Sequence, residues 1–197
     1  MTDDFTIRDQ ISVAPLDLTR FFDRHPSLET ERLLLREISL KDQDAIFAYA
    51  SDPLVTEYVI FPTHQSMKET IAFIESCPRD FAEHKRIEFG IVLKETGKLI
   101  GACGFHHFSS QHHHLEIGYV LNRQHWGKGY MTEVVREMIR YAFEEMGMHR
   151  VQATCDVGNT RSSRVMERCG MTHEATLRDY ELRRGKFVSM KMYGIVR

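Results

Sequence analysis

A glycine-rich turn at residues 124–129, with the sequence Gln-His-Trp-Gly-Lys-Gly, offers the clearest chemistry in the chain. It lies between an apolar run at 115–121 and a helical repeat that begins at Tyr130. The first amide groups of a helix have no partner within the helix, and the helix dipole makes this end positive. Glycine lets the backbone approach an anion closely. The turn therefore predicts a phosphate-binding site, although two glycines alone would also suit a tight strand-to-helix connection.

The elements on either side of this turn are well indicated. Residues 115–121, Leu-Glu-Ile-Gly-Tyr-Val-Leu, have the composition of a strand. Apolar residues then recur at helical spacing from Tyr130 to Met146, which is the strongest periodic signal in the sequence, and Gly147 is well placed to end this helix. A strand that leads directly into a helix would bring the turn to the edge of a sheet.

The rest of the chain predicts a single α+β domain with a mostly antiparallel sheet of about seven strands and about four helices. Two earlier helices should begin at Ser39 and Ser66, each followed three residues later by an acidic side chain, and Pro78 should limit the second. A short helix should begin at Ser162. Further strands are predicted at 32–38, 88–93, 99–105, 150–155 and on both sides of the turn 183–186.

Composition bounds the class of protein. The chain has 197 residues, 42% of them hydrophobic and 27% charged, with a net charge of −2. These values are ordinary for a globular protein, and they give no reason to expect nucleic-acid binding. No apolar run is long enough to cross a bilayer, and the N-terminus does not resemble a signal peptide, so we expect a cytoplasmic protein without membrane contact. The four cysteines are isolated, which argues against a disulfide framework.

Three segments resemble the GNAT superfamily of N-acetyltransferases. Gln124-x-x-Gly127-x-Gly129, followed by Tyr-Met-Thr-Glu, resembles its acetyl-CoA signature. Residues 159–171, Asn-Thr-Arg-Ser-Ser-Arg-Val-Met-Glu-Arg-Cys-Gly-Met, resemble its second motif. Residues 29–36, Glu-Thr-Glu-Arg-Leu-Leu-Leu-Arg, resemble the start of the branch that contains the ribosomal-protein-alanine N-acetyltransferases. The segments occur in the family's order, so we expect an N-terminal arm at 1–28 and a GNAT domain at 29–197.

The resemblance implies a sheet that splays between its fourth and fifth strands. It also implies that the pantetheine arm of acetyl-CoA lies along the strand 115–121 and that the pyrophosphate lies on the turn. Arg164 would suit an adenosine phosphate or simply cover its helix. The residues expected to bind acetyl-CoA are Val120, Leu121, Gln124, Trp126, Gly127, Lys128, Gly129, Tyr130, Met131, Thr132, Asn159, Ser162 and Arg164.

The implied reaction is direct attack of an amine on a thioester, which needs a proton acceptor and a donor for the leaving thiolate. The resemblance offers two glutamates as the base: Glu116, ranked first, and Glu181. Glu37 and Glu88 are further candidates, which could instead bind a cationic substrate. Many family members carry a tyrosine as the thiolate donor, but Met166 stands at that position. Ser162 is the substitute that the motif suggests, or it packs and caps its helix.

The acceptor amine is left open by the sequence. A protein N-terminus of the ribosomal-protein type is expected first, since an α-amino group near pKa 7.7–8.0 needs only a weak base. A small amine such as a polyamine, amino sugar or drug is the alternative, and a non-catalytic acyl-CoA-binding domain is a third. A monomer and a homodimer are both compatible with the sequence.

No metal is expected to take part. Five histidines, at 106, 107 and 112–114, fall in an expected hairpin loop and have no matching carboxylate or cysteine spacing, so we expect them to be solvated. Trp126 is expected to pack under the turn, and segment 52–65 lies where the family places its acceptor-binding loop, although apolar packing would explain it equally.

Overall fold

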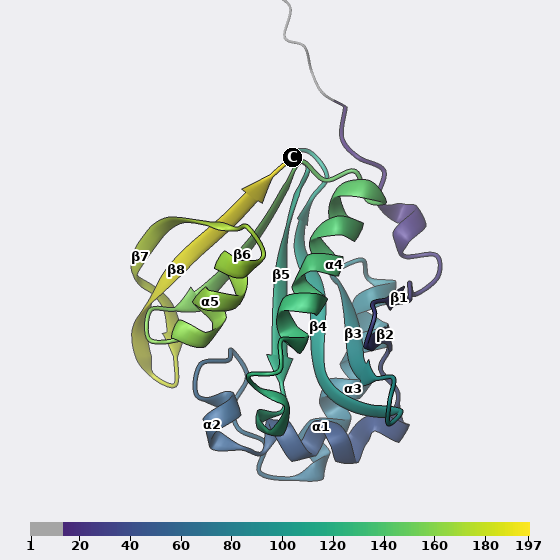
Figure 1. Cartoon of the computed structure of the whole chain (residues 1–197), viewed down its shortest axis with the longest axis vertical. Helices are drawn as coiled ribbons and strands as arrows, with labels where there is room; N and C mark the ends of the chain where they lie inside the picture. Colours follow the sequence, from purple (N-terminus) through teal and green to yellow (C-terminus); the bar gives the residue numbers. More distant parts are fainter. Residues whose placement is uncertain (1–13) are drawn as a thin grey trace, which may run out of the picture.

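The computed structural model describes residues 14–197 as one open sheet with helices on both faces (Figure 1). The sheet has eight strands in the order β1-β2-β3-β4-β5-β6-β8-β7. The strands are β1 (Leu28–Glu29), β2 (Leu33–Glu37), β3 (Arg86–Leu93), β4 (Lys98–Ser109), β5 (His114–Leu121), β6 (Arg150–Asp156), β7 (Thr172–Arg183) and β8 (Lys186–Val196). The helices are α1 (Gln43–Ala50), α2 (Pro53–Thr56), α3 (Met67–Ala82), α4 (Tyr130–Glu144) and α5 (Thr160–Arg168).

The predicted α+β class is confirmed, and the counts differ by one strand and one helix. The extra strand is the two-residue β1, and the extra helix is the single turn α2, whose first residue is Pro53 and whose cap is Asp52. Elements this short carry too little periodicity to be recognised. The strands predicted as the fourth and fifth are β5 and β6, and these two strands do diverge (Figure 1).

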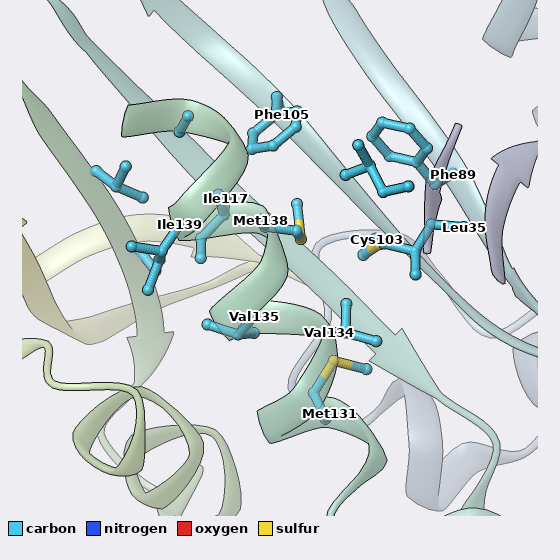
Figure 2. Close-up of a cluster of buried hydrophobic side chains, with 14 of the residues drawn as sticks. Leu35, Phe89, Cys103, Phe105, Ile117, Met131, Val134, Val135, Met138 and Ile139 are labelled. Atoms are coloured by element: carbon cyan, nitrogen blue, oxygen red, sulfur yellow. The ribbon is translucent and has the colours of Figure 1, made fainter. Parts of the chain in front are cut away.

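Hydrophobic residues of α4 build the larger core, on the sheet face that α4 and α5 cover. Their side chains point onto β2, β3, β4 and β5 (Figure 2). Val134, Val135 and Met138 are fully buried, and each such side chain contributes about 1.5–3 kcal/mol to folding. Helices α1 and α3 cover the opposite face around Ile46, Tyr49 and other residues. The periodic signal in 130–146 therefore reflects a real apolar stripe, and it fixes the turn before α4 against the sheet.

The predicted helix boundaries are partly confirmed. Capping boxes at Ser39 and Ser66 open their helices as expected, the first through a short 3₁₀ turn. Gly147 has a φ of 73° and lies just beyond the end of α4. The expectation that Pro78 limits α3 is wrong, because the helix continues through it to Ala82. Pro78 lies on the exposed side of α3, where water can bond the carbonyl that loses its partner.

Residues 14–27 lie against the domain. Leu16 donates its amide to the carbonyl of Ser110 at 3.0 Å, and Phe22 is buried in the larger core. Residues 1–13 of the expected arm fall outside the described residues, and the boundary at 28 and 29 stays a prediction. No helix within 14–197 has the length and apolarity needed to span a membrane.

Candidate active site

Strands β5 and β6 are the only parallel neighbours among the eight strands of residues 14–197, and they are paired over a short length. Their register runs from His114 opposite Arg150 to Glu116 opposite Gln152 and then stops. Beyond Glu116, β5 continues to Leu121 beside β4 alone. The backbone edge of 117–121 that faces β6 therefore has no strand partner among residues 14–197, and the two halves of the sheet separate there (Figure 1).

The glycine-rich turn follows the free end of β5. Gly127 and Gly129 adopt φ angles of 75° and 80°, in the left-handed region that favours glycine. The first backbone bond of α4 runs from the amide of Glu133 to the carbonyl of Gly129. Across residues 14–197, no protein acceptor bonds the amides of residues 127–132. This row of amide groups at a helix N-terminus is suited to bind an anion.

Side chains on both sides hold the turn in place. Trp126 donates its indole N–H to the carbonyl of Leu121 at 2.8 Å, so it packs under the turn as expected. Arg32 donates to the carbonyl of Lys128 at 3.1 Å and forms an ion pair with Glu133 at 2.6 Å. In the sequence, Arg32 stood out only as part of a family motif. No pattern of neighbouring residues predicts that the start of β2 contacts the start of α4.

Glu116 lies at the last position where β5 pairs with β6, on the sheet face opposite α4. Its side chain is 13% exposed. One carboxylate oxygen accepts a hydrogen bond from the hydroxyl of Thr154 on β6 at 3.0 Å, and the other lies 3.2 Å from Nδ1 of His107. The carboxylate is therefore fixed in orientation at the point where the strands part.

Ser162 lies in the first turn of α5, facing β5. Its hydroxyl is 2.9 Å from the phenol oxygen of Tyr119, and its amide donates to the side chain of Asn159 at 3.1 Å. Burial raises the pKa of Tyr119 above its ordinary value, so this phenol keeps its proton. Met166 is fully buried and can donate no proton. Sequence reasoning missed Tyr119, and its place on the strand beside the cofactor turn was the available signal.

Glu181 lies in a different environment from Glu116. Its carboxylate pairs with Arg183 at 3.1 Å, and Arg183, which is 8% exposed, also pairs with Asp156 at 3.1 Å. Within residues 14–197, no hydrogen bond or ion pair joins Glu181 to Glu116, Tyr119 or Ser162. The two candidate bases therefore have different partners, Arg183 for Glu181 and Thr154 and His107 for Glu116.

The other residues expected to bind acetyl-CoA divide by exposure. Leu121 and Met131 are buried, so only their backbone can meet a ligand. The side chains of Gln124, Lys128 and Arg164 are exposed, whereas Val120, Tyr130, Thr132 and Asn159 are half-buried. Arg164 makes no ion pair within residues 14–197, which leaves its guanidinium free for an anion.

A row of glycines lies on the same sheet face as Glu116. Gly104 and Gly118 are register partners on β4 and β5. A Cβ on Gly104 would come within 2.6 Å of the carboxylate of Glu88, and one on Gly118 within 2.9 Å of the ring of His106. Burial raises the pKa of Glu88 to about 7, against the opposing charge of Arg86. These close approaches place the Glu88 carboxylate over Gly104 and the His106 ring over Gly118, on the sheet face that Glu116 shares.

The histidines are not all where the sequence placed them. His106 and His107 belong to β4 rather than to a loop, and His114 begins β5. The sequence shows no matching carboxylate spacing, yet Glu116 contacts His107 from the next strand. Spacing along the chain cannot show a partner that is delivered by strand register.

Segment 52–65 bridges the two halves of the sheet at their separated ends. Asp52 pairs with Arg123, beside the glycine-rich turn, at 2.7 Å. Thr56 accepts a hydrogen bond through its carbonyl from Arg184, on the β7–β8 turn, at 2.6 Å. The segment thus lies across the open end of the splay.

An open mixed sheet whose parallel pair separates beside a helix N-terminus, with amides that have no acceptor among residues 14–197, is the arrangement expected of an N-acetyltransferase. The acetyltransferase (GNAT) domain model matches residues 32–172. The chain is 34% identical over 171 residues to the uncharacterized N-acetyltransferase p20 of Bacillus licheniformis, covering 87% of this chain and 96% of that protein.

Two further comparisons agree. A crystal structure of a GNAT-family acetyltransferase from Bacillus anthracis superposes with a TM-score of 0.78 at 31% identity, covering 87% of this chain and 98% of that one. YdaF of Bacillus subtilis, which bears the provisional name of a ribosomal N-acetyltransferase, is 29% identical over 153 residues, covering 76% of this chain and 82% of that protein. The chain belongs to the GNAT family of N-acetyltransferases.

Proposed function

We propose that this enzyme transfers the acetyl group of acetyl-CoA directly to the α-amine of a peptide or protein N-terminus. The observation that carries the proposal is the row of unpartnered amides at residues 127–132 beside the free edge of β5. A diphosphate can accept hydrogen bonds from these amides, and an extended chain with amide groups can pair with the free edge of β5.

The cofactor would therefore enter at the turn and extend along β5. Its pyrophosphate would accept hydrogen bonds from the backbone between Gly127 and Thr132. Its pantetheine amides would pair with the edge of 117–121 that β6 leaves open. The thioester would then lie between Glu116 and Ser162, the polar side chains that border the splay from β5 and α5.

Glu116 is proposed as the proton acceptor. The amine nitrogen attacks the thioester carbonyl carbon, a C–N bond forms, and the amine proton passes to the carboxylate directly or through a water molecule. Thr154 and His107 hold that carboxylate in place. Glu181 is not proposed for this role because its carboxylate is engaged by Arg183.

Ser162 and Tyr119 are proposed to protonate the leaving thiolate. When the tetrahedral intermediate collapses, the C–S bond breaks and the sulfur takes a proton from the Ser162 hydroxyl. Tyr119, which contacts that hydroxyl at 2.9 Å, returns a proton to it and takes one from solvent in the same relay, so neither oxygen is left charged. The pair does the work for which many family members use a tyrosine at the position of Met166.

The acceptor is proposed to be a peptide for two reasons. An α-amine costs only about 0.5–1 kcal/mol to deprotonate near pH 7.4, against about 4 kcal/mol for a lysine, so a single carboxylate suffices. Large apolar side chains are also exposed on segment 52–65 and on the β7–β8 hairpin, as peptide recognition requires: Ile60, Leu182 and Phe187 are 82%, 64% and 67% exposed.

A small amine is the second candidate, and Glu88 favours it. Its half-buried carboxyl lies on the same sheet face as Glu116, over Gly104, and would suit a compact cationic substrate. The two candidates differ in what the wide end of the splay must bind, because a peptide reaches the apolar side chains there and a small amine does not.

Release of coenzyme A thiol from acetyl-CoA tests the proposal. The purified chain would be assayed with N-terminal peptides that vary in their first residues, the same peptides blocked at the N-terminus, and a panel of polyamines and amino sugars. We expect turnover with the free peptides only. Turnover confined to small amines would show that the acceptor is a small amine and not a peptide. Tight acetyl-CoA binding without any turnover would show that the chain is a binding domain and not an enzyme.

A further inference from the structure

His106, His107 and Glu116 form a cluster of possible metal ligands, in which the Glu116 carboxylate is also the proposed proton acceptor. One ligand atom from each of the three side chains lies within 4.8 Å of the other two. The two histidine Nδ1 atoms are 3.4 Å apart, and Nδ1 of His107 is 3.2 Å from a carboxylate oxygen of Glu116. Two imidazoles and a carboxylate are a ligand set that zinc and similar ions prefer.

The local backbone is distorted in a way that brings these side chains together. His106 and Glu116 are register partners on β4 and β5, so their side chains share a face. His107, as the next residue, would normally point to the opposite face. The β4–β5 register is irregular between His106 and Ser109, and His107 has a φ of 51°, in the left-handed region. A non-glycine residue held there costs about 1–3 kcal/mol, and such strain gathers at functional sites.

Packing also sets the direction of the His106 ring. The ring lies against the bare backbone of Gly118, with Nε2 only 2.9 Å from where a Cβ would stand. Nε2 therefore faces the sheet, and Nδ1 is the nitrogen that meets His107. Any side chain at position 118 would displace the ring from this position, so the glycine is needed for the cluster.

The distances fit a metal ion. In a tetrahedral zinc site with bonds of about 2.0–2.2 Å, ligand atoms are about 3.3–3.6 Å apart. Two of the three separations, 3.4 and 3.2 Å, are close to that edge length, and the third is within 4.8 Å. Three protein ligands would leave one position for water.

The surroundings permit an ion to enter. The side chain of His107 is 74% exposed, and a surface pocket of about 400 Å³ runs beside both histidines. Lys85 and Arg86 also line this pocket, and their charges oppose a cation. Both are paired with acidic side chains, Arg86 with Asp80 at 2.9 Å and Lys85 with Glu83, which reduces that opposition.

We propose that His106, His107 and Glu116 bind a divalent transition-metal ion of the Zn²⁺ type, and that its binding inhibits acetyl transfer. The inhibition rests on the proposed function of Glu116, because a carboxylate oxygen that coordinates an ion no longer accepts the amine proton. The binding itself rests only on the geometry of the cluster.

Metal binding is tested first, without any assay of turnover. The full chain, stripped with chelator, would be titrated with Zn²⁺ by calorimetry and with Co²⁺ by visible absorption, which reports tetrahedral ligation. We expect one saturable site, weakened at least about tenfold in His107→Ala and in His106→Gln. His112→Ala removes an exposed histidine from the neighbouring turn and should bind as the wild type does. Binding that is absent, or equal in His107→Ala and the wild type, would overturn the site.

Inhibition is measured separately, with each variant compared with its own metal-free rate. Zn²⁺ should slow acetyl transfer by the wild type and by His112→Ala at concentrations that fill the site, and should not slow His107→Ala in that range. Saturable binding with no loss of activity would overturn the inhibitory role while leaving the site itself in place. If the protein shows no acetyl transfer, the proposed function is wrong, but the metal-binding result still stands.

Discussion

Thr154 on β6 donates a hydrogen bond of 3.0 Å to Glu116 on β5, across the point where the two strands part. It is the side-chain link between the two halves of the sheet at the place where the proposed chemistry begins. Thr154→Val keeps the shape and removes the donor. We expect kcat to fall about tenfold, as for loss of a hydrogen bond to a charged group, with the KM for acetyl-CoA unchanged. A raised KM with normal kcat would show that Thr154 serves binding instead.

The two candidate bases can be separated by matched substitutions. Glu116→Gln should lower kcat by about 10²- to 10⁴-fold, the usual contribution of a general base, while thermal stability changes little. Glu181→Gln should leave kcat within a few-fold of the wild type and lower the melting temperature, since Arg183 loses one of its two carboxylate partners. Steady-state kinetics and thermal melts on both variants decide, and the reversed pattern would exchange the roles.

The turn can be tested with an internal control. Gly127 has a φ of 75°, and a Cβ there would meet nothing within 4 Å. Gly97, in the β3–β4 hairpin, has a φ of 66° and equally open space. Gly127→Val and Gly97→Val should therefore cost similar stability, about 1–2 kcal/mol each. Only Gly127→Val should raise the Kd for acetyl-CoA, by at least about tenfold, measured by calorimetry on the folded variants. Equal affinities would contradict the pyrophosphate assignment.

Tyr119 and Ser162 should act as a unit. Tyr119→Phe removes only the phenol oxygen, and Ser162→Ala removes the hydroxyl that it contacts. Each change should lower kcat about tenfold or more, and the double variant should be little worse than Ser162→Ala, because residues that act together are not additive. Additive losses would mean that the two hydroxyls serve different steps.

Glu88 should make stability depend on pH. Burial raises its pKa from 4.5 to about 7, so in this range the folded protein keeps a proton that the unfolded chain releases. The favourable contribution is complete below pH 4.5 and is lost as the pH rises to about 7, with a total change of about 3 kcal/mol in the free energy of unfolding. Glu88→Gln should remove this fall. Urea unfolding of both proteins across the range measures it, and identical pH profiles would contradict the burial argument.

Sequence alone predicted the features that depend on near neighbours. Three patterns depend only on residues that are close together in the sequence: the apolar stripe of α4, the capping boxes at Ser39 and Ser66, and the glycine-rich turn. The structure contains each of them. Pro78 was read wrongly, because a proline signal says nothing about whether its helix face is exposed.

The site was harder to predict because its contacts join distant segments. Tyr119 meets Ser162 from 43 positions away, and Glu116 meets Thr154 from 38. The histidine cluster depends on a bulge and on one left-handed residue, His107, which no spacing rule foresees. Family resemblance supplied candidate residues for acetyl-CoA, and only the fold could show that Glu181 is held by Arg183 while Glu116 borders the splay.

Because β5 and β6 are paired over only a short length, hydrogen–deuterium exchange of the β5 backbone can report ligand binding. On the β6 side of residues 117–121, no neighbouring strand from the described part of the chain, 14–197, slows the exchange of backbone hydrogens for deuterium. A ligand that lies along this edge takes the place of the missing strand and protects those hydrogens. Occupancy of the cleft can then be read as a local loss of deuterium uptake, for any acyl chain length and before a single acceptor has been identified.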